Sequence, residues 1–128
     1  MIYPSKMKTV DIKGKDYVTV NERIKYFREH FEGYSLRSEF PLDEIIRGET
    51  IIIKAVIRNP EGIIVSEGTA FEVFGSTYIN KASFVENCET SAWGRALANF
   101  GIGVDSSVAS ADEVANAIKQ KETKLKQK

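Results

Sequence analysis

The sequence has few of the residues on which secreted proteins and metalloenzymes depend. Its 128 residues include one cysteine, Cys88, and one histidine, His30. A single cysteine excludes a disulfide within the chain and is typical of a reducing compartment. One cysteine and one histidine are too few for a zinc site built from these residue types. We therefore expect a cytoplasmic protein without a metal or another cofactor.

Long apolar runs and a net charge are also missing. No stretch approaches the roughly 20 apolar residues that span a bilayer, and the first residues, MIYPSKMK, do not resemble a signal peptide. We expect neither a membrane span nor export. The formal net charge is zero, which argues against a protein that binds nucleic acid over its whole surface. Any nucleic-acid site must therefore be a local groove with a few well-placed cations.

Charge is nevertheless unevenly distributed. Residues 119–128 contain five lysines and one glutamate, a net charge of +4, so the rest of the chain carries −4. Such a tail is typical of a solvated helix end, and it also fits attraction to nucleic acid or to a protein partner. The composition, 42% hydrophobic and 28% charged, is that of one folded domain. We divide it into a core over residues 1–110 and a C-terminal helix with a lysine-rich tail over 111–128.

Hydrophobic spacing predicts an α+β fold. TVDI (9–12) indicates a short strand, and ERIKYFREHF (22–31) a helix capped by Asn21. A strand, YSLRSEF (34–40), follows. ETIIIKAVIR (49–58) and IIVSEGTAFEVF (63–74), joined by NPEG, then predict a long β-hairpin. We expect a curved antiparallel sheet with a helix packed across it, plus a C-terminal helix.

The end of the chain carries two helix signals. Small and apolar residues recur at helical spacing from about Lys81 to Phe100, and Gly101 fits a C-cap. Ser110 and Glu113 have the spacing of a capping box for the last helix.

Signals for catalysis are weak. Cys88 lies among small residues of a packing helix, which is typical of a buried structural thiol, and His30 lies on another helix. The glycines do not have the spacing of a phosphate-binding loop. We therefore predict that the protein is not an enzyme and has no catalytic residues.

Arg95 is the unusual residue of the helix over 81–100, because small side chains surround it in ETSAWGRALANFG. One interpretation is that they let a sugar-phosphate backbone approach the guanidinium. The other is that they permit close packing of the helix on the sheet, with Arg95 paired to an acid such as Glu89 or Asp105. In the hairpin, Lys54 and Arg58 share one face, because side chains alternate along a strand.

These cations suggest a binding surface for a single strand of nucleic acid. Cations contact phosphates and aromatic rings stack on bases with little regard to sequence. The candidates from residue chemistry are Arg95, Lys54, Arg58, Lys81 and the aromatic Tyr34.

Several segments together resemble the single-strand annealing superfamily, which includes the recombination mediator Rad-fifty-two and phage proteins of the Sak and Erf types. The similarity spans residues 17–110: a helix ending HFEGY, a strand, a hairpin closing in EGTAFEVFG, and ETSAWGRALANFG, similar to the family's Lys-Arg-Ala-Leu-Arg-x-Phe-Gly helix. The segment ENCETSAWGRALANFGIG resembles phage and prophage members.

The resemblance implies roles for three residues. Arg95 matches the family's central DNA-contacting arginine, Thr90 a helix threonine near the bound strand, and Tyr34 the aromatic residue after the first helix. Gly94 and Ala98 stand where the family often has Lys and a second Arg, so this groove is less positive. The resemblance also implies a homo-oligomeric ring or filament that anneals single-stranded DNA without ATP. The tail is a candidate for recruiting a single-strand-binding protein.

Two other functions remain open. Long strands beside a helix also fit a hot-dog-like thioesterase or acyl-binding domain. A ring scaffold that has lost DNA binding would account for Gly94 and Ala98.

Overall fold

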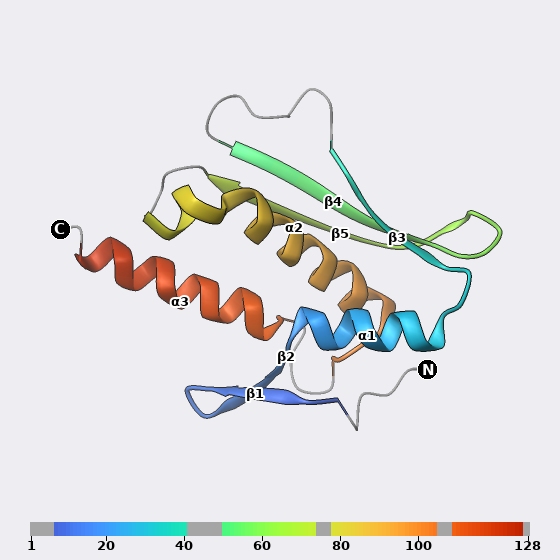
Figure 1. Ribbon diagram of the computed structural model, residues 1–128, viewed down its shortest axis with the longest axis horizontal. Helices are drawn as coiled ribbons and strands as arrows, with labels where there is room; N and C mark the ends of the chain where they lie inside the picture. The colour runs from blue at the N-terminus through green and yellow to red at the C-terminus, as the bar shows by residue number, and fades with distance from the viewer. Residues whose placement is uncertain (1–6, 41–49, 74–77, 105–108, 127–128) are drawn as a thin grey trace.

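The computed structural model describes residues 7–40, 50–73, 78–104 and 109–126 (Figure 1). It has eight elements: β1 (Thr9–Ile12), β2 (Lys15–Val18), α1 (Val20–His30), β3 (Ser35–Glu39), β4 (Thr50–Arg58), β5 (Ile64–Val73), α2 (Tyr78–Phe100) and α3 (Ala111–Lys126). Strands β3, β4 and β5 form an antiparallel sheet in that order, and β1 and β2 form a separate pair. The predicted α+β fold is confirmed.

The molecule is built in layers (Figure 1). The three-stranded sheet is the first layer, and α2 packs across one of its faces. Helices α1 and α3 lie on the other side of α2, with the β1–β2 pair beyond them. The face of the sheet that contacts α2 is called the inner face below, and the opposite one the outer face.

The hairpin of β4 and β5 forms as predicted. Ile53 pairs with Ala70 and Ala55 with Gly68, so the register follows the alternation of the sequence. In the turn, the side-chain oxygen of Asn59 accepts hydrogen bonds from the backbone N–H groups of Glu61 and Ile63. A one-residue irregularity beside Arg58 ends the regular ladder near the turn.

Small side chains let α2 lie directly on β5. Ala92 and Ala96 are fully buried at this contact. A Cβ added to Gly68 would be 2.3 Å from the backbone nitrogen of Ala96, so only glycine fits there. The Ser66 hydroxyl donates a 2.8 Å hydrogen bond to the Ala96 carbonyl, which fixes the helix on the strand. One interpretation of the small residues around Arg95 was that they permit close packing of the helix on the sheet, and the structure shows this packing.

The ends of the helices follow local signals. The N–H groups of Gly101 and Ile102 bond to the carbonyls of Ala98 and Leu97, and Gly101 has a φ of 110°, as the predicted C-cap requires. The capping box of α3 is also confirmed, since Glu113 N–H donates to the Ser110 hydroxyl and Ser110 N–H to the Glu113 carboxylate.

Two predicted details are wrong, and the partner of a correctly predicted strand was missed. The N-cap of α1 is Thr19, whose hydroxyl accepts from Glu22 N–H, instead of Asn21. Helix α2 begins at Tyr78, before Lys81, and its backbone departs from helical geometry at Ser83, where it kinks. The strand over 9–12 has a partner, β2, which the sequence did not indicate because its turn requires Lys13 at a φ of 52°.

Arg23 joins α1 to α2 and to the segment that follows α2, and it was not predicted in the core. Its side chain is fully buried, and it donates hydrogen bonds of 3.0 and 3.1 Å to the carbonyls of Gly94 and Gly103. Burial lowers the pKa of the Arg23 guanidinium, while the carboxylates of Glu113 and Asp112 oppose that shift. Asp112 in turn accepts a 2.7 Å hydrogen bond from Val20 N–H at the start of α1.

Candidate functional site

Arg95 projects from the side of α2 toward β5. Its Nη1 donates a 2.8 Å hydrogen bond to the Thr69 carbonyl, and its Nε lies 3.2 Å from a carboxylate oxygen of Glu113 on α3. The side chain remains 47% exposed. One of the two expectations gave Arg95 an acidic partner such as Glu89 or Asp105. The structure shows an acidic partner, and it is Glu113. Glu89 instead accepts from Ser38, and Asp105 lies outside the described residues.

Asn99, one turn after Arg95, makes a matching contact. Its side-chain amide donates a 2.7 Å hydrogen bond to the Glu67 carbonyl. Glu67 and Thr69 are two residues apart on β5, which is an edge strand of the sheet. Unpaired carbonyls of an edge strand need partners, and α2 supplies two of them here. These contacts hold the Arg95 guanidinium beside the strand.

Two connected grooves lie beside β5. The first, of about 560 Å³, is lined by Glu67, Gly68, Thr69, Arg95, Asn99, Ala109 and Glu113. The second, of about 360 Å³, is bordered by Phe71 and Glu72 of β5, by Ser91 and Arg95 of α2, and by residues of α3. Arg95, Ala109 and Glu113 line both. The two are called the β5 groove below, and Arg95 lies where they meet.

Lys54 reaches the same stretch of β5 from the outer face. It is the direct cross-strand partner of Thr69, whose carbonyl binds Arg95. Its Nζ lies 3.9 Å from the Glu67 carboxylate, and its side chain is 42% exposed. The structure therefore brings two predicted cations, Lys54 and Arg95, to the two sides of one short segment, residues 67–69.

The other four candidates lie elsewhere. Arg58 shares the outer face with Lys54, as expected, but its guanidinium bonds to Glu39 of β3 at 2.9 Å. Thr90 lines a crevice of about 390 Å³ between α2 and α3, which shares Ser91 and Asn116 with the second groove beside β5. Lys81 is in the first turns of α2, and its side chain lies outside the described part.

Tyr34 packs in an aromatic cluster instead of standing open for stacking. Its ring makes edge contacts with Phe27, Phe31 and Phe100, with centroid separations of 5.3 to 6.4 Å. Such contacts are typical of core packing. Among the candidates whose side chains are described, Tyr34 thus does not share an open surface with Arg95 and Lys54.

Acidic side chains also line the β5 groove. Glu67, Glu72 and Glu113 border it, and Arg95 is the cation among the described lining residues. The ion pairs of Lys54 and Arg95 involve largely exposed cations, and such pairs contribute about 0–1 kcal/mol each. A phosphate group can therefore replace the Glu67 carboxylate, which is exposed, at small cost, and salt will weaken this contact.

Phe71 is the surface residue that the sequence interpretation missed. It lies on β5, is 67% exposed and borders the β5 groove. The signal was present in the strand, since Ser66, Gly68 and Ala70 alternate with larger residues. The small residues face α2, so the large ones must face outward.

Cys88 and His30 are not brought together as a catalytic pair. Cys88 is fully buried, with its sulfur near the carbonyls of Ile51 and Ala70. Burial raises the pKa of the Cys88 thiol to about 11, which keeps it protonated at neutral pH. His30 is exposed on α1, where it stacks on Tyr26.

Two other kinds of site are absent from the described residues. No three histidine, cysteine, aspartate or glutamate side chains there are grouped as metal ligands would be. None of the helices in the same residues combines the length and hydropathy that a bilayer crossing requires.

Comparison with known proteins adds no relative. No protein-family model matches the sequence, and neither the curated proteins nor the solved structures include a significant match.

Proposed function

We propose that this protein is a single-strand annealing protein of the phage type. It binds single-stranded DNA along β5 and brings complementary strands together as a homo-oligomeric ring or filament, without ATP or a metal ion. The observation that carries the proposal is the position of Arg95, held at an open groove with Lys54 on the other side of the same strand segment.

The geometry of Arg95 suits a phosphate ligand. Nε and Nη1 are occupied by Glu113 and Thr69, while Nη2 has no hydrogen-bond partner among the described residues. Two N–H donors on Nη2 are thus available to a phosphate oxygen while Glu113 and Thr69 keep their contacts with the other nitrogens. The helix keeps the side chain oriented before DNA arrives, which lowers the entropy cost of binding.

Oligomerisation supports binding by a weakly charged surface. One protomer offers Lys54 and Arg95, with Arg58 further along the outer face. Repeated along a ring or filament, such short cationic segments add their contacts on one strand. Within this proposal the protein acts in the cytoplasm of a bacterial host, and the lysine-rich tail recruits nucleic acid or a single-strand-binding protein.

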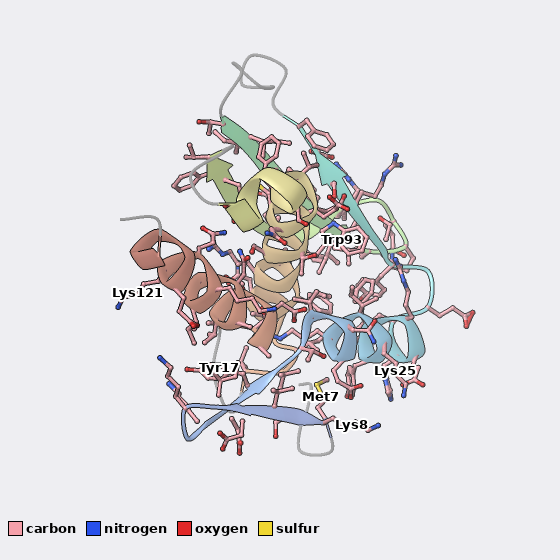
Figure 2. All side chains as sticks on the ribbon, turned by 60° about the vertical axis from the view of Figure 1, so that its left-hand side comes forward. Met7, Lys8, Tyr17, Lys25, Trp93 and Lys121 are labelled. Atoms are coloured by element: carbon pink, nitrogen blue, oxygen red, sulfur yellow. The ribbon has the colours of Figure 1, made fainter. Side chains whose placement is uncertain are left out.

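The decisive experiment compares Arg95→Ala with Lys25→Ala. Both substitutions remove one positive charge, but Lys25 lies on α1, away from α3 and the β5 groove (Figure 2). Binding of a labelled oligonucleotide is measured by anisotropy across a salt titration. We expect Arg95→Ala to weaken binding about tenfold and to reduce the slope of log K against log salt by about 0.7, the value for one lost phosphate contact on a single strand.

Annealing is tested with the same proteins and complementary oligonucleotides in the presence of EDTA and without ATP. We expect the wild type and Lys25→Ala to accelerate annealing and Arg95→Ala to do so less. Particle mass measured in parallel separates the rivals: an oligomer that binds no DNA indicates a ring scaffold. Equal binding by Arg95→Ala and Lys25→Ala at every salt concentration would refute the assignment of the groove.

A further inference from the structure

Phe71 occupies an unusual position for an aromatic residue. It is the most exposed of the large hydrophobic residues in the described part of the chain, at 67%. Its cross-strand partner on the outer face is Ile52, and the residue also borders the β5 groove that contains Arg95. The ring therefore stands on the outer face of the edge strand along which the groove runs.

Two cations are held beside Thr69, the neighbour of Phe71 on the same face of β5. Thr69 precedes Phe71 by two residues and so shares its face, and Lys54 lies directly across from Thr69. Lys54 is therefore a diagonal neighbour of Phe71, at a separation that long side chains can bridge. Arg95 approaches from the groove, with its Nη1 on the Thr69 carbonyl. An exposed ring close to cations on the same strand is the combination with which proteins bind single-stranded nucleic acid.

We infer that Phe71 is the base-stacking residue of this surface. This inference rests on the proposed function and specifies how the strand is held: a nucleobase lies against the Phe71 ring, while Lys54 and Arg95 contact the flanking phosphates. Stacking needs only the flat face of a base, so the site accepts any sequence. It takes the role that the sequence had suggested for Tyr34, whose ring packs in the aromatic cluster.

The other partner that can cover the exposed Phe71 ring is a second copy of the chain. The fully buried core of a subunit interface is depleted in charged residues. On the outer face the Lys54–Glu67 ion pair lies on the Thr69 side of the ring, while Ile52 across the strand and Val73 along it are its apolar neighbours. The charges complement a phosphate backbone better than a self-associating apolar patch.

The test uses three variants and two ligands. Phe71→Ala removes the ring, Phe71→Trp keeps a stacking surface, and Val73→Ala removes another exposed apolar side chain of β5 as a control. The ligands are an oligothymidylate and an abasic oligonucleotide of the same length, which keeps the phosphates but has no bases. Affinities are measured by anisotropy, and particle mass is recorded for every variant.

We expect Phe71→Ala to weaken binding of oligothymidylate roughly 5-fold to 150-fold, the range for loss of one stacked base. Binding of the abasic strand, the particle mass and the salt dependence should stay as in the wild type. Phe71→Trp should restore binding, and Val73→Ala should leave it unchanged.

Three outcomes would overturn the inference. If Phe71→Ala binds both ligands like the wild type while Arg95→Ala is impaired, the strand is bound without stacking on Phe71 and the proposed function stands. If Phe71→Ala dissociates the particle and weakens both ligands equally, the ring contacts a second copy. If the wild type binds neither ligand, the proposed function itself fails.

Discussion

Replacement of Gly68 by alanine tests the contact between α2 and the sheet. The new Cβ would lie 2.3 Å from the Ala96 nitrogen and 2.7 Å from both the Ala92 oxygen and the Arg95 carbonyl carbon. All three are backbone atoms of α2, so no side-chain rotation can relieve the overlap. The helix must move away from β5, which would weaken the Ser66 hydrogen bond to Ala96 and displace Arg95.

The expected cost is large for one methyl group. Overpacking a well-packed core destabilises proteins by about 1–3 kcal/mol, and displacement of a whole helix belongs at the upper end. We therefore expect Gly68→Ala to lower the free energy of unfolding by about 3 kcal/mol, a large share of the roughly 5–15 kcal/mol that typical domains have. Binding to single strands should weaken as well, because Gly68 and Arg95 line the same groove.

Urea unfolding followed by the emission of Trp93 measures this cost. Trp93 is the only tryptophan, and its indole N–H donates a 2.7 Å hydrogen bond to the Ser38 hydroxyl on β3, so it reports on the helix–sheet contact (Figure 2). Gly62→Ala is the control. Gly62 has a φ of 85° with no atom near the added Cβ, so its cost of about 1–2 kcal/mol comes from the backbone alone. If Gly68→Ala costs no more than this control, α2 does not lie on β5 as described.

Two further predictions concern Glu113 and Cys88. Glu113→Gln keeps a residue that can complete the capping box with Ser110 but removes the charge beside Arg95. Single-strand affinity should therefore rise about two- to fivefold at low salt, and by more than in the control Glu122→Gln on the exposed side of α3. Equal gains in the two variants would show that only the net charge of the protein matters. Because the pKa of the Cys88 thiol is raised from 9.0 to about 11 in the folded protein, its contribution to stability is fully present below about pH 9 and is lost between about pH 9 and 11. The unfolding free energy of the wild type should therefore fall by about 2 kcal/mol more than that of Cys88→Ala over this range, and parallel pH profiles would contradict the assignment.

Local patterns accounted for much of the fold. Alternation in β4 placed Lys54 and Arg58 on one face, and Gly101 and the Ser110–Glu113 spacing marked helix ends. These signals depend on neighbours within a few residues, so they can be read along the chain. The N-cap of α1 was misplaced because Thr19 and Asn21 are both good capping residues, and only the structure shows which one has helical N–H groups within reach.

Long-range partners were not predictable in the same way. Arg23 is buried because carbonyls of Gly94 and Gly103, 71 and 80 residues away, accept its donors. Nothing in its own helix distinguishes it from a solvated arginine. For the candidate site, the importance of Arg95 followed from its small neighbours, but its contacts with Thr69 and Glu113 depend on how β5 and α3 pack against α2.

The two borders of the three-stranded sheet differ, and the difference limits how copies can join. Along residues 67–69, donors from Arg95 and Asn99 already occupy carbonyls of β5, whereas β3 has no neighbouring strand on its second side in the described chain. Continuous growth of one sheet through many copies would need both borders to accept a strand. Pairing with a strand from a second copy is therefore less favourable at residues 67–69 of β5 than at the described border of β3.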